Sequence, residues 1–324
     1  MKTLKEIYQA NEELNYIDSS LYSRYRVKAG LRNDNGTGVK VGLTKICDVI
    51  GYKFVHEKKY NIDGQLIYRG YPINYLVDKQ PKDRIFGFEE VAFLLIFGTL
   101  PTEEQLQEFK DYLLNFKMGP VDLQYETPNI LNALQIEVLK LYAKDPSADT
   151  DDLEERMIKG LNILASIPLF TFSYAHNKVF KSYPYPDKSL AENILCMARG
   201  NDQYTLEEAR ILDTLLMIHA DHGGGNNSTF ANVVISSTGT DIYSCISAAI
   251  GSLKGPKHGG ANCKVTNMFK AIFHEVGFTT DKLTLKKIAN RLLDKDFFDH
   301  SGLIYGIGPV SYTHLRAHET VLDL

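Results

Sequence analysis

The stretch TLEEARILDTLLMIHADHGGGNN, residues 205–227, holds the pattern that decides the fold. Thr205 followed by Glu208 forms a capping box, which marks the start of a helix. The apolar residues that follow recur at helical spacing, and the three glycines after His222 predict where the helix ends. From residue 87 onward the chain keeps to helical patterns of this kind, so the expected fold class is mainly α.

Helical patterns of the same kind come before this stretch. Residues 87–98 are typical of a short buried helix that Gly98 stops, and Thr102–Gln105 is another capping box ahead of an apolar stripe. The stripe consists of Leu106, Phe109, Leu113 and Phe116. A long apolar helix is predicted over residues 153–176, where Pro168 is expected to kink or divide it.

Further helices and one β hairpin complete the expected fold. Asp241 is expected to cap a helix rich in small residues, and amphipathic helices are predicted over 265–276 and 281–295. Residues 53–72 alternate as strands do, and Asp63-Gly64 within them favours a hairpin turn. The sequence therefore predicts a mainly helical protein with a small N-terminal β hairpin.

Composition narrows the class of protein. Lys and Arg total 36 against 40 Asp and Glu, a net charge of -4, which argues against nucleic-acid binding. The four cysteines fit neither a zinc pattern nor a dense disulfide framework, so reduced thiols are expected. The N-terminus lacks an apolar core of signal-peptide length, and the longest apolar run, 91–97, is far shorter than the ~20 residues of a membrane span. We expect a soluble, cytoplasmic protein that binds neither nucleic acid nor membranes.

The segment HADHGGGNN, residues 219–227, is the first candidate site. His219 and His222 are three positions apart, which would place both on roughly one face of the helix. The glycines would let the backbone turn and approach a ligand closely. A plain helix end is the alternative, because glycine is common there and histidine favours the negative end of the helix dipole. A metal site at His219, Asp221 and His222 is disfavoured, since the remaining ligands of a zinc site are missing.

The segment GPKHGGAN, residues 255–262, is the second candidate site. It places His258 just ahead of the helix expected to begin near Val265. The positive end of the helix dipole disfavours an imidazolium, so a neutral ring is expected. A neutral imidazole can donate a hydrogen bond to a carbonyl oxygen on which negative charge develops. The alternative is a loop histidine between tight turns. The sequence has no phosphate loop and no nucleophile elbow.

Together these segments resemble the citrate synthase family. HADHGGGNNSTFANVV and GSLKGPKHGGAN resemble its oxaloacetate and acetyl-CoA segments, while residues 62–76 and 88–106 resemble its N-terminal signatures. The four motifs occur in the family's order, from about residue 30 to Gly308. The resemblance implies two mainly helical domains that close over the substrates in a homodimer. We expect a large domain over 1–261, its C-terminal part missing, and the start of a small domain over 262–308.

The resemblance implies roles only for residues inside the matching motifs. His222 would bind oxaloacetate, and Asn226 would line the same pocket. His258 would be the catalytic residue, a neutral histidine that donates a hydrogen bond to the thioester carbonyl of acetyl-CoA as the methyl group loses its proton. The implied reaction condenses acetyl-CoA with oxaloacetate to citrate and CoA, the first step of the tricarboxylic acid cycle. The resemblance implies no cofactor, because acetyl-CoA is a substrate, and no metal.

Two other functions stay open. A 2-methylcitrate synthase shares all of these motifs and differs in the shape of its acyl pocket. A non-catalytic protein could instead keep only a ligand pocket and a dimer surface. The coding sequence beyond Gly308 distinguishes an enzyme from such a binding protein, because the family's remaining catalytic residues follow that point.

The resemblance ends at Pro309. The family continues with Gly-x-Gly-His-x-x-Tyr, whose His polarises the oxaloacetate ketone, whereas GLIYGIG (302–308) leads straight into Pro309, which has no donor. The family's Asp-Pro-Arg segment, its aspartate base and its later arginines have no match. We therefore expect residues 309–324 to be a non-native tail and this chain to be truncated and inactive. A genuine His-to-Pro change with a divergent end is the alternative.

Overall fold

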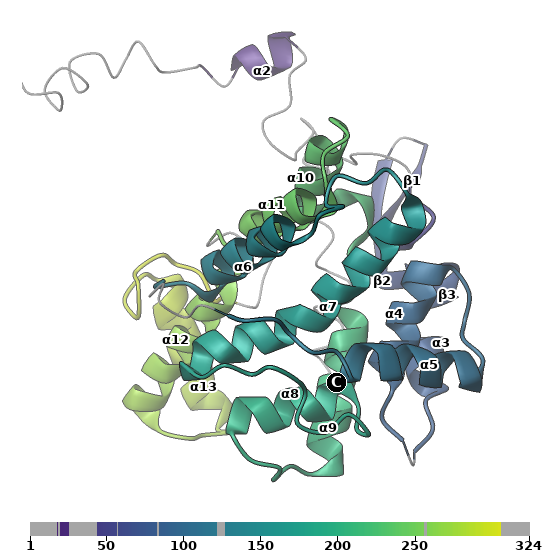
Figure 1. The fold of residues 1–324 in the computed structure, drawn as a ribbon. Helices are drawn as coiled ribbons and strands as arrows, with labels where there is room; N and C mark the ends of the chain where they lie inside the picture. The colour runs from purple at the N-terminus through teal and green to yellow at the C-terminus, as the bar shows by residue number, and fades with distance from the viewer. Residues whose placement is uncertain are drawn as a thin grey trace, which may run out of the picture. The chain divides into compact units, whose positions relative to one another are not determined.

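The computed structural model describes residues 18, 20–25, 44–56, 58–82, 84–121, 127–255 and 258–305. The chain falls into two units, 1–40 and 41–324, which we describe separately. The first unit contributes helix α2, Ser20–Tyr25, and all other described elements belong to the second (Figure 1). The expected tail at 309–324 lies outside the described residues, so it stays a prediction.

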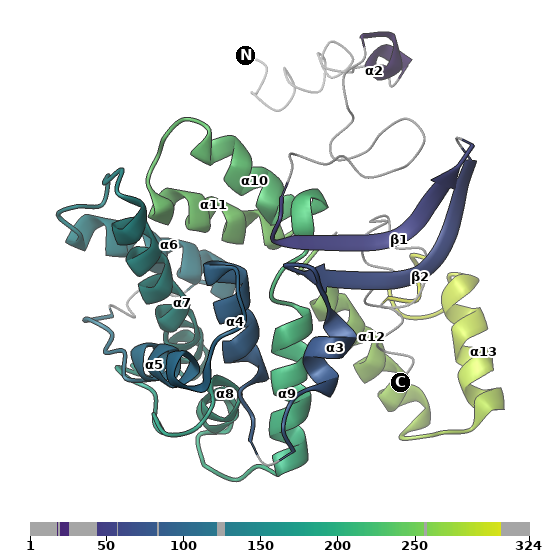
Figure 2. The same ribbon diagram turned by 90° about the vertical axis from the view of Figure 1, so that its right-hand side faces the viewer.

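The second unit opens with a β hairpin. Strands β1, Cys47–Val55, and β2, Lys58–Tyr68, run antiparallel as a long ribbon (Figure 2), and β3, Tyr71–Pro72, pairs with the end of β2. The predicted hairpin is therefore confirmed. Its predicted turn is wrong, because Asp63-Gly64 lies inside β2 and the chain reverses between the two strands, next to His56.

The pairing register explains this difference. Ile50 pairs with Gln65 and Tyr52 with Asn61, so the single residue Gly51 faces three residues of β2. These three are Ile62, Asp63 and Gly64. A bulge takes up extra residues within a ladder and bends the strand, which suits a dipeptide that also favours turns. Asp-Gly thus marks an irregular backbone, and only the pairing decides whether it is a turn or a bulge.

Helices form most of the remaining described chain and confirm the mainly α fold class. They are α3 (Ile73–Asp78), α4 (Gly87–Phe97), α5 (Glu103–Leu114), α6 (Ile130–Lys144), α7 (Leu153–His176), α8 (Leu190–Arg199), α9 (Leu206–Ile218), the 3-10 turn η2 (Gly223–Gly225), α10 (Asn227–Ser236), α11 (Ile242–Leu253), α12 (Ala261–Val276) and α13 (Lys282–Leu293).

Local capping groups set the ends of several helices, as the sequence predicts. Thr102 and Thr205 each accept a hydrogen bond from the backbone three positions on, in complete capping boxes. Asp241 caps the start of α11 through its side chain. Gly98 ends α4 with a φ of 90°, a conformation that glycine adopts without strain. Pro168 lies inside α7 without dividing the helix.

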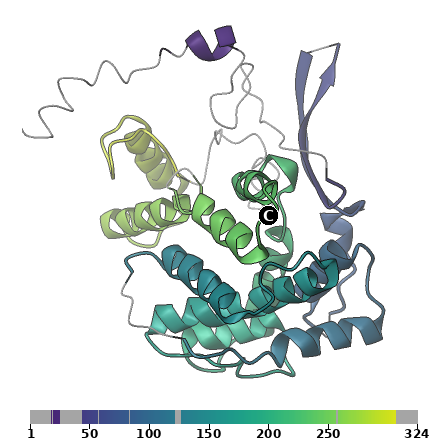
Figure 3. The same ribbon diagram turned by 45° about the horizontal axis from the view of Figure 1, so that its top comes forward.

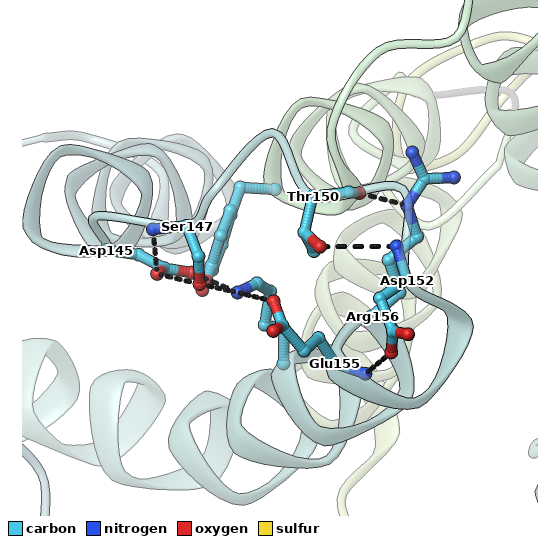
Figure 4. Close-up of polar contacts among 8 residues, drawn as sticks. Asp145, Ser147, Thr150, Asp152, Glu155 and Arg156 are labelled. Carbon is cyan, nitrogen blue, oxygen red and sulfur yellow. Dashed lines mark hydrogen bonds and ion pairs between the residues drawn. The ribbon is translucent and has the colours of Figure 1, made fainter.

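The loop between α6 and α7 ties these helices to α11. Lys159 of α7 lies 2.9 Å from the carboxylate of Asp145, and the Tyr243 hydroxyl of α11 donates a hydrogen bond to the same carboxylate at 2.8 Å. At the far end of the loop, Asp152 accepts a hydrogen bond from the backbone of α7 and caps it (Figure 4). These contacts fix the start of α11 relative to α6 and α7.

Separate apolar clusters hold the second unit together. The largest contains residues of α4, α5, α6, α7 and α8, among them Leu169 and Phe170. Another packs the hairpin against α3, α4 and α9 and includes the completely buried Tyr68. Helices α12 and α13 have their own cluster around Met268 and lie together at one side of the other helices (Figure 3, yellow-green). The expected domain boundary at 261/262 stays a prediction, which this separate cluster supports.

Within the residues that the structure describes, no helix is both long enough and apolar enough to cross a membrane.

Candidate active site

The first candidate segment begins where α9 ends. The helix stops at Ile218, and the backbone N–H of His219 closes its last turn on the carbonyl of Leu215 at 3.0 Å. His222 lies beyond the helix and directly precedes η2. The prediction that His219 and His222 share one helix face is therefore wrong, because the helix ends before His222. The position of His222 is set by the turn at residues 219–225 instead.

The β hairpin holds that turn from outside the motif. The Tyr68 hydroxyl lies 3.0 Å from the carbonyl oxygens of Met217 and Ile218, and it accepts a hydrogen bond from the backbone N–H of Asp221 at 3.2 Å. Burial raises the pKa of Tyr68, so its hydroxyl remains a donor. No sequence motif singles out Tyr68 as a residue of the site. Its alternation with the buried Leu66 on β2 was a signal of burial, but no local pattern reveals its partners.

Backbone geometry also requires the first glycine of the motif. Gly223 has a φ of +68°, and a Cβ added there would lie 3.0 Å from the carbonyl oxygen of Cys47 on β1. The N–H of Gly223 donates to the Asp221 carboxylate at 2.6 Å. The Gly223 backbone therefore approaches β1 of the same chain closely, whereas its approach to a ligand stays a prediction. Burial raises the pKa of Cys47, so this thiol stays neutral beside the turn.

The asparagines that follow begin helix α10. The Asn226 side-chain oxygen accepts a hydrogen bond from the backbone N–H of Ser228 at 2.7 Å and caps the helix. The Asn227 side-chain amide donates to the carbonyl of Ser252 at 2.9 Å, near the C-terminal end of α11. Because Ser252 lies three positions before Gly255, this bond brings the first motif to the start of the second.

The second candidate segment begins after α11 and runs into the start of α12. His258 donates its backbone N–H to the carbonyl of Gly255 at 3.0 Å, and α12 begins at Ala261. The predicted placement of His258 just ahead of a helix is confirmed. Gly259 is needed for the loop, since a Cβ there would lie 2.7 Å from the Leu253 carbonyl oxygen. Partial burial lowers the pKa of His258, which favours the neutral ring that the sequence analysis expects.

The two motifs thus meet at one end of the α10–α11 helix pair. Helices α10 and α11 pack against each other, and α11 packs against α6. That the rings of His222 and His258 share one cleft stays a prediction. In the described ranges, no group of three or more His, Cys, Asp or Glu residues could hold a metal ion.

Comparison with known proteins assigns the family. Residues 32–316 match the family model described as citrate synthase, C-terminal domain. The chain belongs to the citrate synthase family. The matched range runs past Pro309, where the sequence analysis placed the end of the resemblance; the junction itself stays a prediction.

Relatives of known name include both enzymes that the sequence analysis weighed. The chain is 39% identical to a citrate synthase of Haloferax volcanii over 64% of its own length, and 36% identical to 2-methylcitrate synthase 1 of Corynebacterium glutamicum over 61%. These alignments cover 56% and 53% of the two relatives, so the chain spans about half of their length. A citrate synthase of Deinococcus radiodurans is 34% identical over 80% of the chain and 66% of that relative.

Solved structures support the same family. The crystal structure of citrate synthase from Thermotoga maritima matches with a TM-score of 0.61 and 28% identity, covering 86% of this chain and 68% of that one. Citrate synthase from Pyrobaculum aerophilum matches with a TM-score of 0.62 and 26% identity, over 84% and 64%. The mainly helical fold with a small sheet is therefore the fold of citrate synthases.

Proposed function

We propose that this chain carries part of a citrate synthase active site, which condenses acetyl-CoA with oxaloacetate to give citrate and CoA. The observation that carries the proposal is the meeting of the two histidine motifs at one end of the α10–α11 pair, through the Asn227–Ser252 hydrogen bond. Acetyl-CoA is a substrate in this reaction, and no cofactor or metal is part of the proposal.

His258 is the proposed catalytic residue. Its neutral ring donates a hydrogen bond to the thioester oxygen while a carboxylate base removes a proton from the methyl group, and the bond stabilises the enolate that forms. The enolate carbon then attacks the oxaloacetate ketone, and water cleaves the resulting thioester to release citrate and CoA. The lowered pKa of His258 suits this role, because an imidazolium would lose its proton to the enolate.

His222 and Asn226 are the proposed oxaloacetate ligands. Asn226 caps α10 through its side-chain oxygen, which leaves the amide N–H groups as the part of the side chain that suits a carboxylate or ketone oxygen. A capping role also fixes the side chain before the ligand arrives, so binding loses less conformational entropy. The short turn ahead of α10 places His222 within a few residues of this group.

The proposal also includes a homodimer and a cytoplasmic location. Helix α10 buries none of its residues within one chain, and Val233 and Val234 on it are 42% and 52% exposed. A partner copy that covers this face would form a homodimer. All four cysteines are free, which suits the cytoplasm.

A 2-methylcitrate synthase is the second candidate. It is favoured by the similarity to 2-methylcitrate synthase 1 of C. glutamicum, which at 36% identity is close to the 39% found for the H. volcanii citrate synthase. The acyl group distinguishes the two enzymes, and propionyl-CoA in place of acetyl-CoA tests it.

Oxaloacetate binding is the sharpest test of the proposed site. We expect slow CoA release from this 324-residue chain, because Pro309 stands where the family has the ketone-polarising His and one such donor is worth about a hundred- to a thousandfold in turnover. Calorimetric titration should instead detect weak oxaloacetate binding that His222→Ala weakens at least about tenfold, the loss of one charge-assisted hydrogen bond. The matched control is His219→Ala, which removes the neighbouring ring. Equal affinities of wild type and His222→Ala would refute the site.

A further inference from the structure

We propose that Tyr68 is a positioning residue of this site, whose buried hydroxyl fixes the turn that carries His222. The choice of oxaloacetate as the ligand rests on the proposed function. The clamp, by which we mean the contacts of the Tyr68 hydroxyl with residues 217–221, rests on hydrogen bonds within the chain. Tyr68 comes from β2, and its partners lie 149 to 153 positions further along the chain. Neither histidine motif contains Tyr68.

The Tyr68 hydroxyl contacts both the last turn of α9 and the chain that follows it. The last carbonyls of a helix have no donor from a following helical turn. The Tyr68 oxygen lies 3.0 Å from two such carbonyls of α9, those of Met217 and Ile218. The Met217 carbonyl also accepts the backbone N–H of Ala220 at 3.4 Å. It also lies 3.3 Å from the Asp221 carbonyl and accepts from the Asp221 N–H at 3.2 Å. A phenol has one proton to donate and lone pairs to accept, so a single oxygen links the end of α9 to the residue just before His222.

The surroundings give that link little room to relax. Tyr68 is completely buried, in the cluster that packs the hairpin on α9. On the far side of His222, the Gly223 backbone approaches the Cys47 carbonyl of β1 so closely that it would leave only 3.0 Å for a Cβ. The Cys47 thiol lies 3.6 Å from the Asp221 carbonyl oxygen. His222 is therefore held between two contacts with the hairpin, one on each side along the chain.

Removal of the hydroxyl should loosen the turn and leave the ring packing in place. Ligand affinity falls in proportion to the fraction of molecules whose site is correctly arranged. Tyr68→Phe should thus weaken oxaloacetate binding even though Tyr68 does not touch the ligand. A tyrosine that only fills the core would lack this effect.

Tyr183 provides the matched control. It is also buried, and its hydroxyl donates to the Ala165 carbonyl of α7 at 2.8 Å, in a cluster that contains neither motif. Tyr183→Phe makes the same chemical change at a similar burial. A difference in hydrogen exchange or in oxaloacetate affinity between the two variants is therefore due to the position of the lost hydroxyl.

The experiment measures hydrogen exchange by mass spectrometry and oxaloacetate affinity by calorimetry for wild type, Tyr68→Phe, Tyr183→Phe and His222→Ala. In Tyr68→Phe we expect exchange of residues 219–226 to rise about tenfold and the Kd to rise about five- to tenfold, the effect of one lost hydrogen bond. Tyr183→Phe should change neither. Unchanged exchange at 219–226 in Tyr68→Phe, or equal losses of affinity in both tyrosine variants, would overturn the inference.

The experiment also decides the inference if oxaloacetate does not bind at His222 or if Tyr68→Phe does not fold. If wild type and His222→Ala bind oxaloacetate equally, the proposed function fails, and the exchange data still decide on the clamp. If Tyr68→Phe does not fold, the Asp221 amide of the wild type decides instead. Strong protection of that amide supports the clamp, and exchange at the rate of an unstructured peptide contradicts it.

Discussion

Glu89 shows most clearly how single residues in this fold depend on their surroundings. Its carboxyl group is completely buried on α4, where one oxygen accepts a hydrogen bond from the backbone N–H of Leu190 at 2.7 Å. Burial and the nearby charge of Asp213 raise the pKa of Glu89 to about 8, although Lys110 opposes them. A neutral Glu89 can cap α8 without the cost of a buried charge. The folded chain therefore favours the protonated form of Glu89, and ionisation of this group lowers stability.

This protonation predicts a fall in stability with rising pH. Between the ordinary value of 4.5 and about 8, the folded chain binds a proton at Glu89 that the unfolded chain has released, so the free energy of unfolding falls as pH rises. The slope from this one group is about 1 kcal/mol per pH unit. Glu89→Gln keeps a neutral acceptor for Leu190 and should remove that slope. Urea unfolding of both proteins from pH 6 to 8 measures it.

The comparison of slopes separates Glu89 from its neighbours. Asp213 on α9, Lys110 on α5 and Tyr183 before α8 interact electrostatically with Glu89, and all three are present in both proteins. Burial raises the pKa of Asp213 to about 6, so most of its contribution lies below this window. Identical slopes for wild type and Glu89→Gln would show that Glu89 is charged in the folded chain.

At the scale of elements, the turn between α9 and α10 depends on a glycine that faces a strand. Gly223 and Gly239 both have positive φ, at +68° and +79°. Only Gly223 lies against another part of the chain, since a Cβ at Gly239 would meet nothing within 4 Å. The pair therefore separates the cost of backbone strain from the cost of close approach.

Alanine substitution at the two glycines should destabilise the protein unequally. Gly239→Ala should lower the free energy of unfolding by about 1 to 2 kcal/mol, the cost of a left-handed conformation. Gly223→Ala should cost about 1 to 3 kcal/mol more, because its methyl group meets the Cys47 carbonyl and forces the turn away from β1. Urea titrations compare the two, and equal losses would mean that the turn does not depend on its contact with β1.

The elements that could be predicted from sequence are those with local causes. The capping boxes at Thr102 and Thr205 act over three residues, so sequence alone locates the starts of α5 and α9. The bulge at Asp63-Gly64 depends on strand pairing, and a local signal misplaced the turn. The Tyr68–Asp221 contact spans 153 positions, so no sequence pattern could reveal that the hairpin supports the first motif.

At the scale of the whole second unit, the two candidate residues belong to segments with different apolar surroundings. His222 belongs to the part that packs with the hairpin and α9, while His258 directly precedes α12, whose apolar cluster is separate. Several side chains on α12 and after it are well exposed, including Phe269 at 57%, Phe273 at 58% and Phe278 at 90%. A shift of α12 and α13 would move His258 relative to His222, which is how the domain closure implied by the family resemblance would act on this site.

A crystal structure of this chain with oxaloacetate and carboxymethyl-CoA tests most directly whether His222, Asn226 and His258 form one active site. The carboxylate of that analogue stands in for the enolate oxygen of acetyl-CoA. We predict that oxaloacetate contacts His222 and Asn226, and that the His258 ring lies within hydrogen-bond distance of the analogue's carboxylate in the same cavity. Ligands bound elsewhere, or imidazoles of His222 and His258 that face separate surfaces, would contradict the assignment of both residues.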